Sequence, residues 1–181
     1  MITIVTGNPE KQKEFSRILP SGITFASPPL KEIQSWSLRG IVEQKARDAF
    51  AAIGTPVIVE DVALEIAAMN RFPGPFVKYW EREVGYETAL LVCQAKNNNA
   101  VQVRCAQAYC DANGVLYAEQ VDQGRFVPRT DGEGFGFDFY FILDGHEKTY
   151  AQMGRDEKIK ISHRTRCFEQ LVEQLKQKQL L

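Results

Sequence analysis

The sequence lacks the segments that direct a chain into or across a membrane. No stretch approaches the ~18 consecutive apolar residues that a membrane-spanning helix needs, so we expect no membrane span. Met1 is followed at once by the strand-like run Ile-Thr-Ile-Val, without the basic start and cleavage site of a secretory signal. These absences favour a cytoplasmic protein.

Cysteine and histidine are also scarce. The chain has four cysteines and two histidines, and no two cysteines stand in a CxxC pair. Zinc and redox motifs need tighter cysteine pairs or histidines close by. We therefore expect Cys93, Cys105, Cys110 and Cys167 to be reduced thiols, buried or at strand edges, in a cytoplasmic protein.

There is no excess of positive charge. Lys and Arg number 22 against 23 Asp and Glu, a net charge of −1. Proteins that grip long nucleic acids carry a basic excess, so we expect no stable nucleic-acid partner, whereas a small anionic ligand needs only a few clustered cations. With 181 residues, 44% of them apolar, we expect one folded domain over residues 1–181.

Hydrophobic periodicity and turn signals predict a chain that mixes strands and helices. The predicted strands are 2–6, 23–26, 56–59, 64–68, 101–110, 115–126 and 137–143. The predicted helices are 10–19, 37–53, 76–84, 87–95 and one that Ser162 caps. This order indicates an α/β or α+β domain and allows two lobes around a cleft.

Residues 6–11, Thr-Gly-Asn-Pro-Glu-Lys, join an apolar strand to a helix through a turn that contains glycine. Free backbone N–H groups at a helix start favour an anion, and Lys11 adds a positive charge one turn into the helix. The Walker pattern GxxxxGK[ST] is absent, which disfavours a P-loop ATPase. The segment is a candidate phosphate-binding turn, with an ordinary strand–helix turn as the alternative.

Two adjacent carboxylates, Glu60 and Asp61, follow the apolar run Val-Ile-Val. Neighbouring residues of an extended chain point to opposite sides, so the two should not share one role. One could hold Mg²⁺ or activate water, since hard cations prefer oxygen ligands, and the other could face a second lobe. The alternative is a solvated strand end.

Glycine stands beside aromatic residues in two further segments. Residues 72–78, Phe-Pro-Gly-Pro-Phe-Val-Lys, form a rigid turn that aims the next helix, which alone is a structural feature. Residues 134–140, Gly-Phe-Gly-Phe-Asp-Phe-Tyr, offer aromatic faces on which a planar base could stack. They partly match the RNA-recognition octamer, but Glu133 and Asp138 place negative charges where that motif has a basic residue and valine, which disfavours RNA binding.

The segment 158–164, Lys-Ile-Lys-Ile-Ser-His-Arg, places cations around the start of a predicted helix. The helix dipole there favours anions, so the choice indicates a ligand with negative charge or several acceptors, with a solvated basic patch as the alternative. There is no GxSxG elbow, and His146 and His163 have no triad spacing.

Taken together, these segments resemble the inosine triphosphate pyrophosphatase family, also called Ham1-like. The resemblance rests on five segments in family order, residues 6–11, 59–66, 72–78, 134–141 and 157–164. One such segment would be weak evidence, but five in order are highly specific. Lys45, and Glu32 within Lys-Glu-Ile-Gln, are also similar to family positions.

The resemblance implies an elongated α/β (mixed α+β) fold of two lobes around a long mixed sheet, with a central nucleotide cleft. It implies hydrolysis of non-standard purine nucleoside triphosphates (ITP, dITP and XTP) to the monophosphate and pyrophosphate, which cleanses the nucleotide pool. It also implies a requirement for Mg²⁺ and a homodimer.

The family's roles carry over only to matching positions. Asp61 would orient or deprotonate the attacking water, and Glu32 and Asp61 would hold Mg²⁺. Phe135 would stack on the purine. The residues that would contact the substrate are Thr6, Gly7, Asn8, Pro9, Glu10, Lys11, Lys45, Lys78, Phe135, Gly136, Phe137, Asp138, Lys158, His163 and Arg164.

The chain also departs from the family pattern. Ile159 stands where the family usually has Asn, and Phe139 where it has Pro, which bears on base preference more than on hydrolysis. Two alternatives stay open. One is a Maf-like nucleotide pyrophosphatase with another base preference, and the other is a catalytically idle nucleotide-binding or RNA-binding protein.

Overall fold

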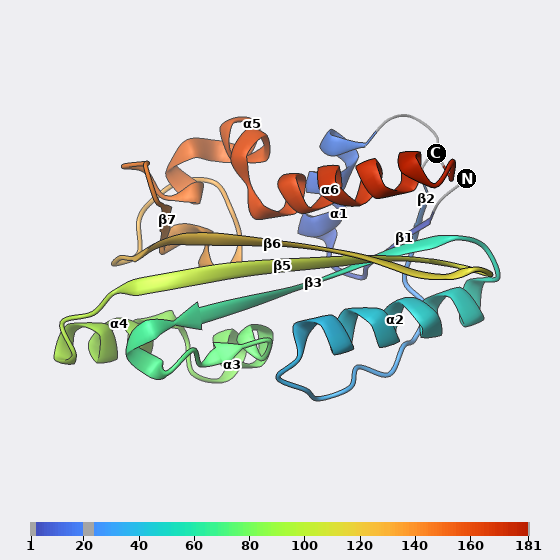
Figure 1. Cartoon of the computed structure of the whole chain (residues 1–181). Coiled ribbons are helices and arrows are strands. Elements are labelled where there is room, and N and C mark those ends of the chain that lie inside the picture. Colours follow the sequence, from blue (N-terminus) through green and yellow to red (C-terminus); the bar gives the residue numbers. More distant parts are fainter. Residues whose placement is uncertain (1–2, 20–23, 181) are drawn as a thin grey trace. The chain divides into compact units, whose positions relative to one another are not determined.

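The computed structural model describes residues 3–19 and 24–180, and these form two compact units. Unit 1 comprises Met1–Asp61, Cys105–Gln120 and Arg164–Leu181, and unit 2 comprises Val62–Arg104 and Val121–His163. Strands β3 (Val57–Ile66), β5 (Ala100–Asp111) and β6 (Gly114–Phe126) each contribute to both units (Figure 1). The strand order is β2-β1-β3-β5-β6-β7, with β4 paired to β3, so the predicted mixed α/β class is confirmed.

Unit 1 contains the parallel part of the sheet. Strand β1 (Thr3–Val5) pairs in parallel with β2 (Thr24–Ala26) and with β3, so that Ile4 lies opposite Phe25 and Ile58. Ile4 and Val5 of β1 and the first three residues of β3 form continuous apolar runs, as parallel strands buried on both faces do. The first residue of each predicted strand 2–6 and 23–26 lies outside the described residues.

Three helices contribute to unit 1, α1 (Pro9–Ile18), α2 (Leu38–Ile53) and α6 (His163–Gln177). Helix α2 begins and ends as predicted, because Ser37 caps it through the Gly40 N–H and Gly54 takes a left-handed φ of 76°. Phe15 of α1 packs edge-to-face against Phe168 of α6 at a centroid distance of 6.0 Å. The helix predicted after Ser162 is thereby confirmed, and Phe168 lies on its buried side.

Unit 2 is rich in short elements. They are η1 (Ala67–Met69), β4 (Pro73–Gly74), α3 (Val77–Glu83), α4 (Tyr86–Ala95), η2 (Gly136–Phe139), β7 (Phe141–Leu143) and α5 (Tyr150–Ile161). Strands β6 and β7 pair antiparallel, and a Cβ at Gly124 would lie 2.2 Å from the Ile142 carbonyl oxygen, so only glycine fits there. Tyr86, Phe126 and Tyr140 pack together in the core.

Three predicted elements were wrong. Strands 56–59 and 64–68 are one strand, β3, which runs through Glu60 and Asp61, while residues 67–69 form a 3-10 turn. The predicted strand 137–143 is interrupted, because Gly136 has a φ of 60° and starts the 3-10 turn η2. Helix α5 was missed, since Gly154, with a φ of 71°, breaks the helical pattern inside it.

The thiol state of the cysteines and the apolar character of the described helices both fit the amino-acid composition. The four cysteines are free and buried, as predicted, and burial raises the pKa of the Cys105 thiol well above its ordinary value. Of the helices in residues 3–19 and 24–180, none has the length and apolar character needed to cross a bilayer.

Candidate active site

The turn at residues 6–11 is held by its own side chains. The Asn8 side chain caps helix α1 and accepts the N–H groups of Glu10 at 2.9 Å and Lys11 at 3.3 Å. The Thr6 hydroxyl accepts the Asn8 N–H at 3.2 Å, and Gln12 donates to the Thr6 carbonyl at 2.9 Å. The expectation of free N–H groups at this helix start was therefore wrong for Glu10 and Lys11, whose donors are used by the cap.

The remaining predicted residues of this turn are accessible. Gly7 and Pro9 are exposed, and Pro9 is the first residue of α1. A Cβ at Gly7 would lie 2.7 Å from the Ser27 hydroxyl, so glycine permits a close approach of the two loops. The Glu10 carboxylate pairs with Lys13, 2.6 Å away on the same helix.

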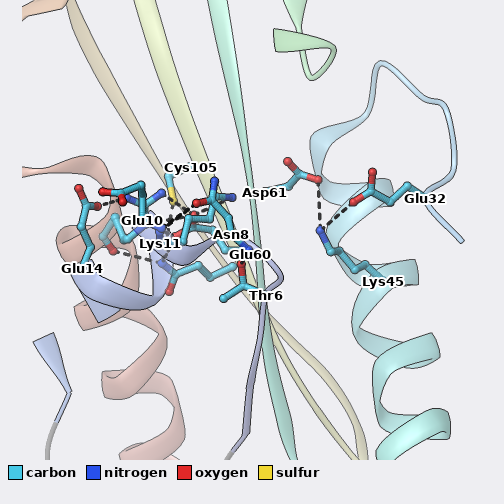
Figure 2. Close-up of polar contacts among 12 residues, drawn as sticks. Thr6, Asn8, Glu10, Lys11, Glu14, Glu32, Lys45, Glu60, Asp61 and Cys105 are labelled. Atoms are coloured by element: carbon cyan, nitrogen blue, oxygen red, sulfur yellow. Dashed lines mark hydrogen bonds and ion pairs between the residues drawn. The ribbon is translucent and has the colours of Figure 1, made fainter. Parts of the chain in front are cut away.

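Lys11 ends in a buried network of charges (Figure 2). Its Nζ atom lies 3.1 Å from Oε1 of Glu60, which is only 4% exposed on β3. The same carboxylate accepts from Arg164, through Nη2 at 2.8 Å and Nε at 2.9 Å, and from Gln107 at 3.1 Å. Nη1 of Arg164 donates to Glu14. The network therefore joins α1, β3, β5 and α6 within unit 1.

Arg164 keeps its charge although it is buried. Burial by itself would lower its pKa, but the carboxylates of Glu60 and Glu14 outweigh that effect and raise the pKa well above its usual value. Buried charges are tolerated when they are paired and hydrogen-bonded. Since the guanidinium is directed at these two carboxylates, the predicted contact of Arg164 with the substrate stays a prediction.

Asp61 points away from Glu60, toward helix α2 (Figure 2). Its Oδ2 lies 3.8 Å from Nζ of Lys45, and the same Nζ lies 3.4 Å from Oε1 of Glu32. The alternation of β3 thus separates the two neighbouring carboxylates, as predicted. It brings Asp61, Glu32 and Lys45 together, three residues that stand far apart in the sequence.

The two carboxylates around Lys45 fit the chemistry of a magnesium site. The side chains of Asp61 and Glu32 are 26% and 43% exposed, so their oxygens are open to water and ligands. Mg²⁺ binds through one or two carboxylates and completes its shell with waters and substrate phosphates. Among residues 3–19 and 24–180, no cluster of three or more Asp, Glu, His or Cys side chains suited to a metal occurs.

In unit 2, a buried ion pair lies beside aromatic rings. Nζ of Lys158, on α5, lies 2.7 Å from Oδ2 of Asp138, on η2, and the two side chains are 3% and 2% exposed. The same oxygen accepts the N–H of Phe135 at 3.0 Å. Lys158 also lies over the Phe135 ring at 4.9 Å and the Tyr150 ring at 5.5 Å. Asp138 and Lys158 thereby fix the backbone and the ring of Phe135.

The other aromatic-segment residues lie in the same unit. The buried His163 ring packs at 5.8 Å from Phe137 and 5.9 Å from Tyr150. Gly136 follows Phe135 in a left-handed conformation. Lys78 is an exposed residue in the first turn of α3. The predicted contact of Lys78 with the substrate stays a prediction.

Sequence reasoning missed two members of the buried network, Glu14 and Gln107. The sequence indicated that both residues are polar groups on a buried face. Glu14 precedes the apolar Phe15 on the inner side of α1, and Gln107 stands among the apolar residues of a strand. A polar residue on a buried face needs a polar partner. The pattern indicates that such a partner exists, but it does not say which residue it is.

Comparison with known proteins identifies the family of this chain. The profile of the Ham1 family matches residues 2–174. A dITP/XTP pyrophosphatase of Methanopyrus kandleri is 37% identical, over 95% of this chain and 94% of its own. An inosine triphosphate pyrophosphatase of Saccharomyces cerevisiae is 32% identical, over 97% and 96%. The structure of a HAM1 protein from Coxiella burnetii matches with a TM-score of 0.84 and 26% identity, covering 97% of this chain and 98% of that chain. The chain therefore belongs to the Ham1 family.

Proposed function

We propose that this protein is a nucleoside triphosphate pyrophosphatase that hydrolyses ITP, dITP and XTP to the monophosphate and pyrophosphate. Relatives that carry the names of dITP/XTP and inosine triphosphate pyrophosphatases support this reaction. The observation that carries it is the arrangement of Asp61 and Glu32 around Lys45, in the same unit as the 6–11 turn and Lys11.

In this reaction, water attacks the α-phosphorus, the bond to the bridging oxygen breaks, and pyrophosphate leaves. Asp61 is open enough to hold the attacking water and accept its proton, a role that contributes ~10²–10⁴-fold in enzymes. Negative charge grows on the leaving pyrophosphate. Lys11 and Lys45 would stabilise it, and such electrostatic stabilisation is the main contribution of a protein to phosphoryl chemistry.

Glu32 and Asp61 would hold a Mg²⁺ ion together with the triphosphate. The ion would supply positive charge that neutralises the phosphate oxygens. Lys45, which pairs with both carboxylates here, would then be available to the phosphates. Removal of divalent ions with EDTA should abolish turnover, and added Mg²⁺ should restore it.

Base recognition is assigned to unit 2. Phe135, held by Asp138 and Lys158, offers an aromatic face for the purine. A 6-oxo purine presents an acceptor to donors such as Lys158 and His163, whereas adenine presents an amino donor. A mismatch of this kind at a buried polar site rejects an analogue by ~10⁴-fold.

A homodimer and a cytoplasmic location complete the proposal. The resemblance to the family supports the dimer, and the four free, buried cysteines support a reducing compartment. Light scattering of the purified chain tests the dimer, since a monomer mass would exclude it.

The proposal is tested by pyrophosphate release with Mg²⁺ from ITP, dITP, XTP, GTP, ATP, TTP and UTP. We expect the first three to exceed ATP in kcat/KM by at least about tenfold, because adenine presents an amino donor where they present a 6-oxo acceptor. GTP shares that acceptor, so its turnover tests recognition at the 2-position of the purine. If TTP or UTP were hydrolysed faster than ITP, the Maf-like alternative would replace the proposal. Triphosphate binding without any turnover would instead identify an idle nucleotide-binding protein.

A further inference from the structure

We propose that Glu60 is a positioning residue, which fixes the ammonium group of Lys11 for contact with phosphate oxygens and itself touches neither substrate nor metal. The inference rests on the proposed function for its catalytic consequence, although its effect on phosphate affinity is measurable without turnover. Glu60 lies on the side of β3 opposite to Asp61.

The hydrogen bonds of Glu60 leave its carboxylate little freedom. Oε1 receives Lys11 at 3.1 Å and Arg164 Nη2 at 2.8 Å. Oε2 receives Arg164 Nε at 2.9 Å and Gln107 Nε2 at 3.1 Å. Since the donors come from α1, β5 and α6, the carboxylate is held from three directions, and the position of Lys11 follows from it.

The side chains of Glu60 and Lys11 are buried to different extents. The side chain of Glu60 is 2% exposed, whereas that of Lys11 is 17% exposed. Lys11 is thus anchored on a buried group while part of its side chain stays accessible to a ligand. Glu60 has no such access, which separates its role from that of the more open Asp61.

The charges of the network are balanced. Glu14 and Glu60 face Arg164 and Lys11, two negative groups against two positive ones. If Glu60 were neutral, Arg164 and Lys11 would share one carboxylate, and repulsion between the two cations would drive the more exposed Lys11 outward. A lysine displaced in this way would retain its charge but would lose its alignment with the phosphates.

The first test compares Glu60→Gln with Glu65→Gln. Both glutamates are buried on β3, and Glu65 also pairs with two arginines, Arg71 and Arg104, but it lies in unit 2 and away from Lys11. We expect E60Q to lower kcat/KM for ITP by about 10–100-fold and to raise the inhibition constant of pyrophosphate by a similar factor. E65Q should leave both values within about twofold of those of the unchanged chain. A folded E60Q with unchanged kinetics and pyrophosphate inhibition would overturn the inference.

A double-variant cycle separates positioning from a merely structural role. If Glu60 acts through Lys11, then Lys11→Met combined with Glu60→Gln should be no more than about twofold worse than Lys11→Met alone. Losses that multiply would overturn the inference, because Glu60 would then act independently of Lys11.

Two further measurements keep the inference testable if E60Q does not fold or if the chain has no activity. If E60Q does not fold, Gln107→Met removes one bond to Glu60 without touching Lys11, and we expect a loss of about 3–10-fold that again vanishes in the Lys11→Met background. If the unchanged chain hydrolyses no triphosphate, the proposed function fails, while calorimetry with inorganic pyrophosphate still measures the coupling between Glu60 and Lys11. Absence of coupling in that measurement would refute the positioning role itself.

Discussion

The two units bury charge in different surroundings. In unit 1, Glu60 and Glu14 face Arg164 and Lys11, so charged groups bind one another. In unit 2, the buried pair of Asp138 and Lys158 lies among aromatic rings. Under the proposed function, the partly exposed Lys11 at the edge of the first network would meet the phosphates, and the rings around the second pair would stack on the base.

The buried ion pairs of the two units also explain why cations occur around residues 158–164, where the helix dipole does not favour them. Arg164, at the start of α6, is paired with Glu60 and Glu14, and Lys158 is paired with Asp138. These internal carboxylates supply the negative charge that the sequence pattern suggested an external ligand would supply. Arg164→Ala would therefore disturb the buried network and is a poor test of base recognition.

The largest effect is expected in unit 1, at Asp61. Asp61→Asn keeps the shape of the side chain but cannot accept a proton, so we expect kcat for ITP to fall about 10³-fold while triphosphate binding changes less. Pyrophosphate release and calorimetry measure the two quantities. The control is Asp48→Asn on α2, an aspartate that bonds with Gln44 and has no proposed role in the reaction. Turnover of D61N close to that of the control would remove Asp61 from the mechanism.

In unit 2, the ion pair should matter first for stability. Lys158→Met leaves Asp138 charged and buried without its cation, so we expect the free energy of unfolding to fall by about 3–5 kcal/mol. Urea denaturation measures the change, and Lys160→Met, on the same helix but exposed, should change it by less than about 0.5 kcal/mol. A loss below about 1 kcal/mol in K158M would show that the pair contributes little.

A smaller effect should distinguish base binding from phosphate binding. Phe135→Leu removes the aromatic face, and since stacking on one base contributes about 1–3 kcal/mol, KM for ITP should rise about tenfold or more with a smaller change in kcat. Phe139→Leu, four residues on and beneath Arg129, is the matched control. Equal KM values for the two variants would argue against Phe135 as the stacking residue.

The smallest effect concerns acid stability. Burial alone would raise the pKa of Glu65, but hydrogen bonds from Arg71 and Arg104 hold it below its ordinary value. A depressed pKa contributes stability above the unfolded-state pKa, and this contribution is lost as pH falls through the folded-state pKa. The difference in unfolding free energy between the unchanged chain and Glu65→Gln should thus shrink by about 1 kcal/mol from pH 7 to pH 3. A difference that stays constant with pH would contradict this assignment.

Much of the fold could be predicted because its causes are local. The strand alternation that separates Glu60 from Asp61 depends on two neighbouring residues. The cap at Ser37 depends on a side chain within three residues of the helix start. Family membership followed in the same way, from the order of short segments.

Other features were decided only when distant segments met. Arg164 and Glu60 are 104 positions apart in the chain, and Arg164 and Glu14 are 150 apart, so no local pattern joins them. β3 continues through Glu60 because those distant cations offset the burial of its charge. Lys45 likewise lies between Glu32 and Asp61 only because a loop, a helix and a strand converge. Local side-chain preferences can be read along a chain, whereas the pairing of buried charges depends on distances that folding alone creates.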